Sequence, residues 1–466
     1  MNIEQLNELV QLLGEEKVIT SASDLSSYRF DYWCVKHYRD WQGQHIDSPA
    51  CVVRPHRTED VQATMRFAYC NGLPVVPFGL GSGVCGGIEP SPSQILLDMG
   101  AMNAIGHIDD VDLLATFEAG VNGLVAEEAV AKHGLTIGHW PQSVAISSVG
   151  GWVSTRASGQ FSTAYGNIED IIYAMEVVLP NGELLQLGKA PRAAAGPDLR
   201  HLFMGAEGTM GVVTKVTFSL RRQAAHREVS AYYAADMAEG FKIQRLIIQS
   251  EWRPPVMRLY DASEVARLFP AFVSGNCCVL LMVHEGPVSR VKAELSDIKD
   301  LCDEQGLVAA DNAIVYQWME HRNNVPKWKD LLAQGLIADT VEVSATWQQI
   351  EALYDGVIAA LNTVPSIVNA SGHSSHVYRS GINLYFTFVC QPENTADMED
   401  LYFECWDKAL SATASFGGGV AHHHGVGRLR KNYIHHDLGE NGVELLRLLK
   451  QSIDQKGIMN PGNLIK

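Results

Sequence analysis

The sequence predicts an α+β fold divided into two domains, and three observations support this prediction. The chain has 466 residues, more than the roughly 250–300 residues that one hydrophobic core usually fills. From residue 50 onward, short apolar strands alternate with amphipathic helices, and after residues 221–228 longer helices separate the strands. We therefore expect a first domain over residues 1–222, a second over 223–416 and a closing segment over 417–466.

The first domain begins like a βαβ unit. Thr58 opens an expected helix over residues 58–72 that ends at Gly72, and a second helix is expected over 124–134. The dipeptide Asn181–Gly182 predicts a hairpin turn. Strands are expected over residues 50–55, 73–78, 95–99, 113–120, 171–188 (as that hairpin) and 211–220.

The second domain alternates strands with longer helices, and the closing segment is glycine-rich and then helical. Strands are expected over residues 229–234, 257–261, 277–286, 340–347 and 382–390. Helices are expected up to about residue 250, over 288–306, behind residue 347 and over about 395–414.

Composition excludes several classes of protein. A formal net charge of −17, with no cluster of Lys and Arg, argues against a nucleic-acid partner. No stretch approaches the ~18 uncharged apolar residues of a membrane span. Nine cysteines without a C-x-x-C pair are typical of a reducing compartment rather than of a disulfide framework. We expect a cytoplasmic protein without a transmembrane segment.

The stretch PFGLGSGVCGG, residues 77–87, carries five glycines after an apolar strand. It satisfies G-x-G-x-x-G, but Pro90 and Pro92 stand where the helix of a dinucleotide fingerprint would run. Because proline inside a helix costs ~3 kcal/mol, that fold is excluded. The loop is predicted to bind an anion with its own N–H groups. A purely structural turn is the alternative.

A second tract poor in large side chains covers residues 141–172 and contains a single arginine, Arg156. Its glycines and hydroxyl groups offer hydrogen-bond donors to a phosphate or a polar ring edge, with Trp152 as an apolar anchor. A packed glycine-rich loop is the alternative.

Together with residues 196–216 (GPDLRHLFMGAEGTMGVVTKV), these tracts resemble the FAD-binding domain of the vanillyl-alcohol oxidase and p-cresol methylhydroxylase (PCMH) family. Within that family they are most similar to its alkyldihydroxyacetone-phosphate synthase branch. The resemblance implies a two-part PCMH-type FAD-binding domain, completed by the closing segment, and a cap domain with an antiparallel sheet flanked by helices. Homodimers occur in this family.

The resemblance also implies which residues contact FAD. Several relatives tether the flavin through a histidine near the first loop, but this chain has Ser82 and Gly83 there, so we expect non-covalent FAD. The predicted cofactor-binding residues are Pro77, Phe78, Gly79, Leu80, Gly81, Ser82, Gly83, Pro141, Gln142, Ser143, Val144, Ala145, Ile146, Ser147, Thr155, Arg156, Ala157, Ser158, Glu207, Gly208, Thr209, Met210, Gly211, Val212 and Val213.

Two residues of the second domain are predicted to bind the substrate. Arg258 lies on an apolar strand and matches an arginine of the synthase branch; a guanidinium suits a phosphate or carboxylate, so the substrate is expected to be a small anion. A salt bridge to an acid such as Asp261 is the alternative. Tyr378 is the second predicted substrate contact.

Tyr385 is a candidate catalytic residue. Strand alternation places it on the polar face with Asn383 and Thr387, and it matches the catalytic tyrosine of the synthase branch. A phenol of pKa ~10 needs nearby cations or a proton relay to act as a base at neutral pH. The alternative is an ordinary sheet tyrosine.

His422, His423 and His424 are the other candidate catalytic residues, because they match a histidine triplet of the synthase branch. On an extended backbone His423 would face away from its neighbours. His373 and His376 have a metal-ligand spacing, but the acids that accompany such histidines in flavin-linked 2-hydroxy-acid dehydrogenases are missing, so we expect no metal.

Two activities fit these residues about equally. The first is an FAD-dependent oxidoreductase that removes a hydride from the hydroxyl-bearing carbon of a small anionic alcohol or hydroxy acid. The second is the redox-neutral acyl-to-alkyl exchange of alkyldihydroxyacetone-phosphate synthase. A non-catalytic flavoprotein is a minor third interpretation. The sequence leaves the electron acceptor open.

Overall fold

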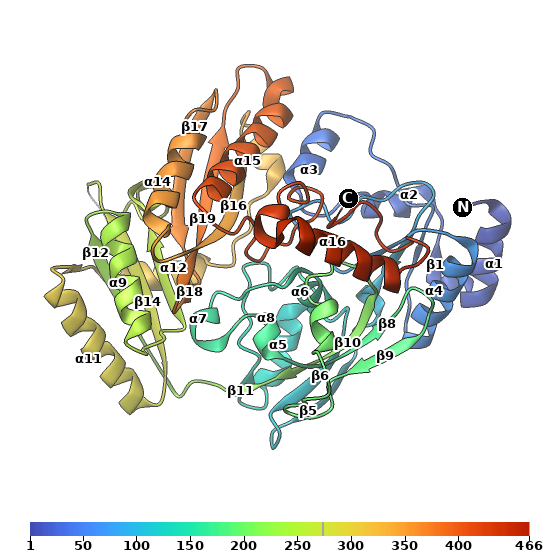
Figure 1. Cartoon of the computed structure of the whole chain (residues 1–466), viewed down its shortest axis with the longest axis horizontal. Coiled ribbons are helices and arrows are strands. Elements are labelled where there is room, and N and C mark those ends of the chain that lie inside the picture. Colours follow the sequence, from blue (N-terminus) through green and yellow to red (C-terminus); the bar gives the residue numbers. More distant parts are fainter. Residues whose placement is uncertain (273–274, 466) are drawn as a thin grey trace.

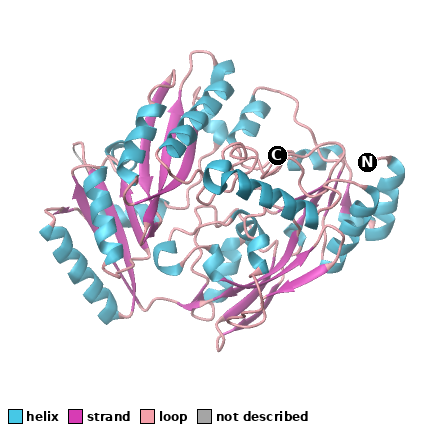
Figure 2. Ribbon diagram, viewed as in Figure 1, coloured by secondary structure: helices cyan, strands magenta, loops and turns pink. Residues whose placement is uncertain are grey.

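Two sheet-based parts, with a C-terminal segment between them, make up the fold (Figures 1 and 2). The computed structural model describes residues 1–272 and 275–465. It mixes helices with largely antiparallel sheets, which confirms the α+β prediction.

The first part contains two main sheets. In the four-stranded sheet, of order β1-β2-β4-β3, strands β2, β4 and β3 are parallel and β1 pairs with β2 antiparallel. The five-stranded sheet, of order β5-β6-β10-β8-β9, is antiparallel, and β7 pairs with β11 separately. The strands are β1 (Val18–Ile19), β2 (Cys51–Val53), β3 (Val75–Phe78), β4 (Ile95–Asp98), β5 (Ile105–Asp109), β6 (Leu114–Glu118), β7 (Leu135–Thr136), β8 (Ile172–Val178), β9 (Leu184–Leu187), β10 (Val212–Ser219) and β11 (Arg221–Arg222).

Local sequence signals determine the ends of several helices in this part. The Asn2 side chain accepts a hydrogen bond from the backbone of Gln5 in a capping box that starts α1. Gly72, in the left-handed conformation, ends α4 as predicted. The helices are α1 (Ile3–Leu13), α2 (Ala22–Leu25), α3 (Cys34–Trp41), α4 (Thr58–Asn71), α5 (Gly123–Ala131), α6 (Val149–Thr155), α7 (Ser162–Tyr165) and α8 (Ile168–Ile171), with 3₁₀ turns at Glu15–Lys17, Ser26–Tyr28, Met99–Ala101 and Leu199–Leu202.

The second part is built on one large antiparallel sheet of order β15-β12-β14-β13-β17-β19-β16, with β18 on β19. This agrees with the predicted cap. The strands are β12 (His226–Ala234), β13 (Val256–Tyr260), β14 (Cys278–Gly286), β15 (Val308–Ala309), β16 (Ile337–Thr346), β17 (Ile367–Ser374), β18 (Val377–Tyr378) and β19 (Gly381–Cys390). The helices are α9 (Met237–Gln249), α10 (Ala262–Leu268), α11 (Val288–Glu304), α12 (Ala313–His321), α13 (Trp328–Leu332), α14 (Ile350–Leu361) and α15 (Met398–Ser415), with a 3₁₀ turn at Thr395–Asp397.

Alternate side chains of this sheet point to opposite faces. One face is apolar, and the other is polar along β16, β17 and β19, whereas Val279 and Leu281 of β14 on that side belong to a second apolar cluster. Met257 and Leu259 on β13, and Leu384 and Phe386 on β19, are fully buried in the core shared with α9, α14 and α15. Figure 1 shows these three helices over one face of the sheet. Arg258 and Tyr385 therefore lie on the opposite face.

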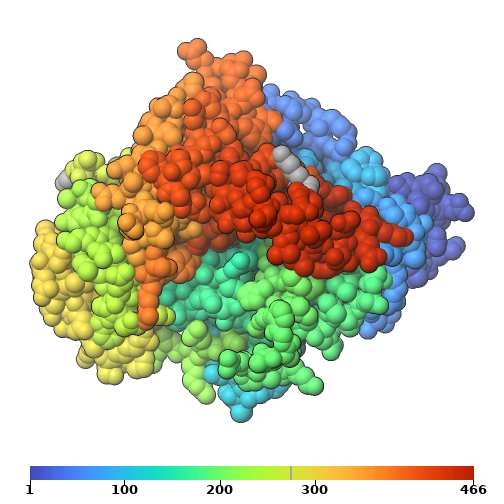
Figure 3. Space-filling view, in the orientation of Figure 1, coloured from blue at the N-terminus to red at the C-terminus, as the bar shows by residue number. Residues whose placement is uncertain are grey.

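The C-terminal segment joins the two parts. Its helix α16 (His435–Ile453), interrupted at Gly439, crosses the visible face between them (Figure 3). Ile458 and Met459 lie in the core of the first part, and Val75 donates from its N–H to the Ile458 carbonyl. The end of this segment thus packs with the first part, whereas Val420 packs in the cap core together with Trp33 of the predicted first domain. The predicted domain bounds stay a prediction.

No helix among the described residues has the length and apolar character needed to cross a membrane.

Candidate functional site

The glycine loop that follows β3, residues 79–87, has backbone N–H groups without hydrogen-bond partners among the described residues. Within the part of the chain that the structure describes, the N–H groups of residues 79–87 donate no hydrogen bond. Gly81 and Gly86 have φ of +71° and +69°, a conformation that favours glycine. A row of unpaired, half-buried N–H groups is the arrangement expected of an anion-binding loop.

The second tract packs directly against this loop. A Cβ atom on Gly79 would lie 2.5 Å from the Ser148 hydroxyl, so only glycine permits this approach. Trp152, buried as predicted for an apolar anchor, donates to the Ser147 hydroxyl at 2.8 Å. The half-exposed Arg156 side chain pairs with Glu169 at 2.9 Å.

The third predicted cofactor segment contacts the C-terminal segment. The Glu207 carboxylate accepts hydrogen bonds from the N–H groups of Val426 (2.5 Å) and Gly427 (2.8 Å). Burial raises its pKa, and these two N–H groups oppose the shift. The Glu207 main chain is occupied too, because its N–H donates to the Ser154 carbonyl and its carbonyl accepts from the Asn460 amide, so a contact of Glu207 with the cofactor stays a prediction.

The C-terminal segment brings the predicted cofactor tracts together. A Cβ on Gly425 would lie 2.8 Å from Glu207, and one on Gly427 would lie 2.0 Å from the Cys85 carbonyl. Since the unpaired N–H groups and close-packed glycines converge here, these residues fit a diphosphate-containing cofactor such as FAD.

On the polar face of the cap sheet, four side chains form a row across adjacent strands. Tyr260 (β13) pairs with His373 (β17), His373 with Tyr385 (β19), and Tyr385 with Glu342 (β16). The rings of His373 and Tyr385 stack at 4.7 Å, inclined by 10°.

Arg258 lies two residues before Tyr260 on the same face. Its Nε donates to the Tyr260 hydroxyl at 2.7 Å, and its guanidinium lies 5.4 Å from the centre of the Trp318 ring. Among residues 1–272 and 275–465 no carboxylate lies within ion-pair distance of it, although the side chain is only 8% exposed. Asp261, the alternative partner, binds Gly372 and Tyr354 instead. Arg258 is therefore available to an anionic ligand.

The histidine triplet is bent, so the prediction that His423 would face away from its neighbours is wrong. The Nδ1 atoms of His422 and His423 lie 2.7 Å apart, and His423 Nε2 lies 2.6 Å from the Tyr385 hydroxyl. Bends over residues 422–424 replace the extended backbone that alternation assumes. His422 Nε2 contacts the Tyr378 hydroxyl at 2.8 Å.

A buried ion pair holds the triplet in place. Arg430 donates to both carboxylate oxygens of Glu342, one at 2.6 Å, and both side chains are fully buried. Glu342 also accepts from the His424 N–H at 2.8 Å. Burial alone would raise the pKa of Glu342, but Arg430 and His424 outweigh it and hold that pKa well below its usual range. The carboxylate is therefore ionised at neutral pH.

His422, His423 and Tyr385 are electrically neutral at physiological pH. Burial raises the pKa of Tyr385 well above its ordinary value, with Arg258 opposing the shift. Burial lowers the pKa of His422 to about 4 and holds that of His423 well below its usual range. Tyr385 is thus a phenol that exchanges protons only through a partner, and His423 is the partner in contact.

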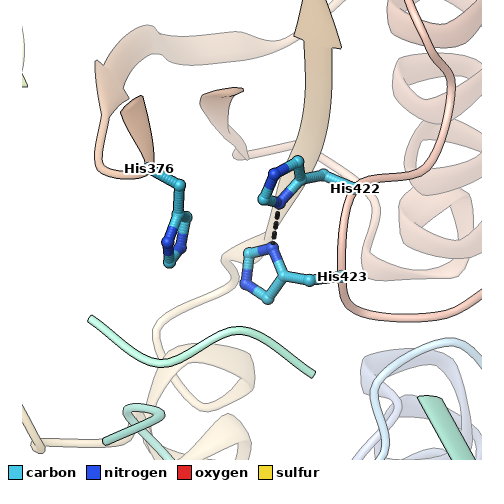
Figure 4. A group of neighbouring side chains, drawn as sticks. All are labelled: His376, His422 and His423. Carbon is cyan, nitrogen blue, oxygen red and sulfur yellow. Dashed lines mark hydrogen bonds between the residues drawn. The ribbon is translucent and has the colours of Figure 1, made fainter. Parts of the chain in front are cut away.

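His376, His422 and His423 offer three ring nitrogens within 4.8 Å of one another, a grouping that could hold a metal ion (Figure 4). Hydrogen bonds already use both ring nitrogens of His422 and His423, and His376 Nδ1 binds the Ser162 hydroxyl at 2.6 Å. The absence of a metal stays a prediction, which retention of activity after dialysis against a chelator would support.

The sequence reasoning missed three charged residues of this region: Glu342, Arg430 and Arg322. Glu342 had a local signal, because it is an acid within the apolar segment TVEVSATW, whereas Arg322 and Arg430 stand in polar segments that gave none. Arg322 donates to Gln160 at 2.7 Å and lies over the rings of Trp140 and Phe161. Burial and the nearby Arg227 lower its pKa to about 10, with a smaller effect from Arg258.

Comparison with known proteins identifies the family. Residues 49–188 match the model of the FAD binding domain, and residues 223–464 match that of the C-terminal domain of FAD linked oxidases. The chain belongs to the FAD-linked oxidoreductases. It is an enzyme with FAD as cofactor, as predicted.

Relatives of this FAD-linked oxidoreductase cover almost its whole length. The uncharacterized FAD-linked oxidoreductase YgcU of Escherichia coli K12 is 34% identical over 98% of this chain and 97% of its own. Alkyldihydroxyacetonephosphate synthase of Dictyostelium discoideum is 27% identical over 91% of this chain and 74% of its own.

Solved structures show the fold. A structure of alkyldihydroxyacetonephosphate synthase superimposes with a TM-score of 0.81 at 24% identity, covering 99% of this chain and 85% of its own. One of p-cresol methylhydroxylase has a TM-score of 0.76 at 16% identity, covering 99% and 96%. The predicted PCMH-type fold is confirmed.

The first testable prediction concerns the attachment of FAD. Because residues 77–87 contain no histidine, acid or heat denaturation is expected to release free FAD. Absorbance of the supernatant near the flavin maximum measures the release. Yellow colour that stays with the precipitated polypeptide would contradict the prediction.

The second prediction concerns the stability of the FAD-loaded enzyme in acid. His422 has a folded pKa of about 4 against an ordinary 6.5, so the unfolded state binds its proton first as the pH falls. This contribution to stability is complete above pH 6.5 and is lost progressively between about 6.5 and 4, on the order of 3 kcal/mol in total.

Urea denaturation at several pH values measures this loss. His422→Asn should have a shallower dependence of unfolding free energy on pH in that window. His45→Asn, which changes a side chain 88% exposed, is the matched control. Identical curves for wild type and His422→Asn would refute the assignment.

Proposed function

We propose that this enzyme oxidises the hydroxyl-bearing carbon of a small anionic alcohol or hydroxy acid. The observation that carries the proposal is Arg258, a buried guanidinium without a carboxylate partner among the described residues, on the same sheet face as Tyr385. Bound FAD supplies the two-electron acceptor. Arg258 and the nearby Arg322 would bind the anion.

Tyr385 would take the hydroxyl proton of this substrate. A neutral phenol accepts that proton only if it passes its own to a neighbour, and His423 Nε2 lies 2.6 Å from its oxygen. The predicted roles of Arg258, Tyr385 and the triplet are thus mutually consistent.

A second candidate is the acyl-to-alkyl exchange of alkyldihydroxyacetone-phosphate synthase. Sequence identity of 27% to such a synthase favours it. Against it, identity is higher, at 34%, to YgcU, and the chain spans 74% of the Dictyostelium synthase. We rank the oxidoreductase first.

One experiment separates the two. The purified FAD-loaded enzyme is mixed anaerobically with lactate, glycolate or glycerol 3-phosphate, and separately with palmitoyl-dihydroxyacetone phosphate and hexadecanol. Bleaching of the flavin band by a hydroxy compound, reversed by an electron acceptor, is the expected result. Ether product without net flavin reduction would overturn the oxidoreductase in favour of the synthase.

A further inference from the structure

A continuous chain of hydrogen bonds leads away from Tyr385. Its hydroxyl lies 2.6 Å from His423 Nε2, the two Nδ1 atoms of His423 and His422 lie 2.7 Å apart, and His422 Nε2 lies 2.8 Å from the Tyr378 hydroxyl. Figure 4 shows the middle contact, with the two imidazole rings turned toward each other. All four ring nitrogens are engaged.

The proton count of this chain allows two arrangements. Each neutral imidazole has one N–H donor and one acceptor nitrogen. If Tyr385 donates to His423, then His423 donates from Nδ1 to His422, and His422 donates from Nε2 to Tyr378. If Tyr378 donates to His422, every bond points the other way. In both cases His422 and His423 hold opposite tautomers.

We propose that His423, His422 and Tyr378 form a proton wire that connects Tyr385 to the boundary between the two domains. The proposal rests on the proposed function, which releases one proton from the substrate hydroxyl. As that proton binds the Tyr385 oxygen, the phenol proton passes to His423 Nε2. The His423 Nδ1 proton then passes to His422, the His422 Nε2 proton to Tyr378, and the Tyr378 proton to water.

Protons are conserved in this transfer. Each group gains one proton and loses one, so no charge stays on a side chain and one proton reaches solvent. The transfer reverses the direction of every hydrogen bond. The first arrangement returns when a proton enters at Tyr378 and Tyr385 gives one up inside the site, as an electron acceptor that takes up a hydride equivalent and a proton from reduced flavin would require.

The outer end of the wire lies at the FAD-binding domain. The Tyr378 hydroxyl is 3.3 Å from the Asn167 amide nitrogen, and Ser158 donates to Asn167 Oδ1 at 2.7 Å. An amide does not pass protons on, but Asn167 and Tyr378 are both partly exposed at the domain boundary. We therefore place the exit of the wire at Tyr378, which acts as a positioning residue; its predicted contact with the substrate stays a prediction.

The first test is independent of turnover. Nitrogen-15 NMR of the FAD-loaded enzyme, with labelled histidine and assignment by His422→Asn and His423→Asn, reports each tautomer. We expect one Nδ1–H and one Nε2–H tautomer at neutral pH. Two identical tautomers, or an imidazolium at either position, would overturn the wire even if no substrate of the proposed class is found.

The second test uses Tyr378→Phe, which removes the terminal hydroxyl and keeps the ring. With the hydroxy compound that reduces the wild-type flavin, we expect kcat to fall roughly a hundredfold, the lower end of the range for general acid–base groups. FAD content and KM should not change. Added imidazole, a small proton carrier, should restore part of the rate, and the solvent deuterium isotope effect should increase.

Tyr433→Phe is the matched control, since its hydroxyl binds Asp407 outside the wire. If Tyr378→Phe has the wild-type rate and the wild-type isotope effect, protons do not leave through the Tyr378 hydroxyl and the proposed exit is refuted. If Tyr378→Phe does not fold, His422→Asn interrupts the wire one step earlier and is read in the same way. Failure of every hydroxy compound to reduce the flavin would refute the proposed function instead.

Discussion

Tyr385→Phe is expected to lower kcat by roughly 10²–10⁴-fold, the range of general acid–base catalysis. The substitution removes the hydroxyl that lies 2.6 Å from His423 Nε2 but keeps the ring that stacks on His373. The substrate should therefore bind normally while its hydroxyl proton has no acceptor. Anaerobic stopped-flow measurement of flavin reduction reports the chemical step.

A tyrosine elsewhere on the cap sheet provides the control for this loss. Tyr233 on β12, whose hydroxyl donates to the Phe272 carbonyl, is changed to phenylalanine in parallel. Near-normal flavin reduction by Tyr385→Phe would remove Tyr385 from the reaction. Equal losses in both variants would point to a general effect on the cap.

Glu342→Gln is expected to destabilise the folded enzyme by about 3–5 kcal/mol, the cost of leaving one partner of a buried ion pair alone. Glu342 and Arg430 are fully buried, so the variant leaves the Arg430 charge uncompensated in the cap. Urea denaturation of the FAD-loaded enzyme measures the change in unfolding free energy.

The matched control is Glu444→Gln, whose pair with Arg447 is about half exposed and should contribute less than about 1 kcal/mol. The double variant Glu342→Leu, Arg430→Met removes both charges and should regain part of the loss. The remainder includes the bond from the His424 N–H to Glu342 and the 2.9 Å contact of His424 Nδ1 with the same carboxylate. A Glu342→Gln variant as stable as wild type would contradict a structural role for the pair.

These two predictions concern neighbouring positions with different roles. Tyr385 and Glu342 pair in register across β19 and β16, yet Tyr385 contacts His423 whereas Glu342 holds Arg430 and the backbone of His424. A loss of rate without loss of stability at Tyr385, and a loss of stability at Glu342, would separate the reacting group from its support.

The family resemblance and local sequence signals determined the fold class, the elements of the two domains and the cofactor. Thr58 and Gly72 marked a helix, Asn181–Gly182 a hairpin, and strand alternation placed Tyr385 on the polar face. Such signals depend on residues a few positions apart, so they predict a helix, turn or strand without knowledge of what the segment packs against. The five glycines of residues 77–87 likewise predicted a loop that presents its own N–H groups, and those groups are unpaired within the described part of the structure.

Only the tertiary structure decided which groups meet at the site. Strand register brought His373 and Glu342 beside Tyr385, and the bend at the triplet turned His422 and His423 toward each other. Register and loop bends depend on contacts between residues far apart in the chain, such as Glu342 with Arg430. No local period encodes those contacts, because they arise only when the C-terminal segment packs between the two domains.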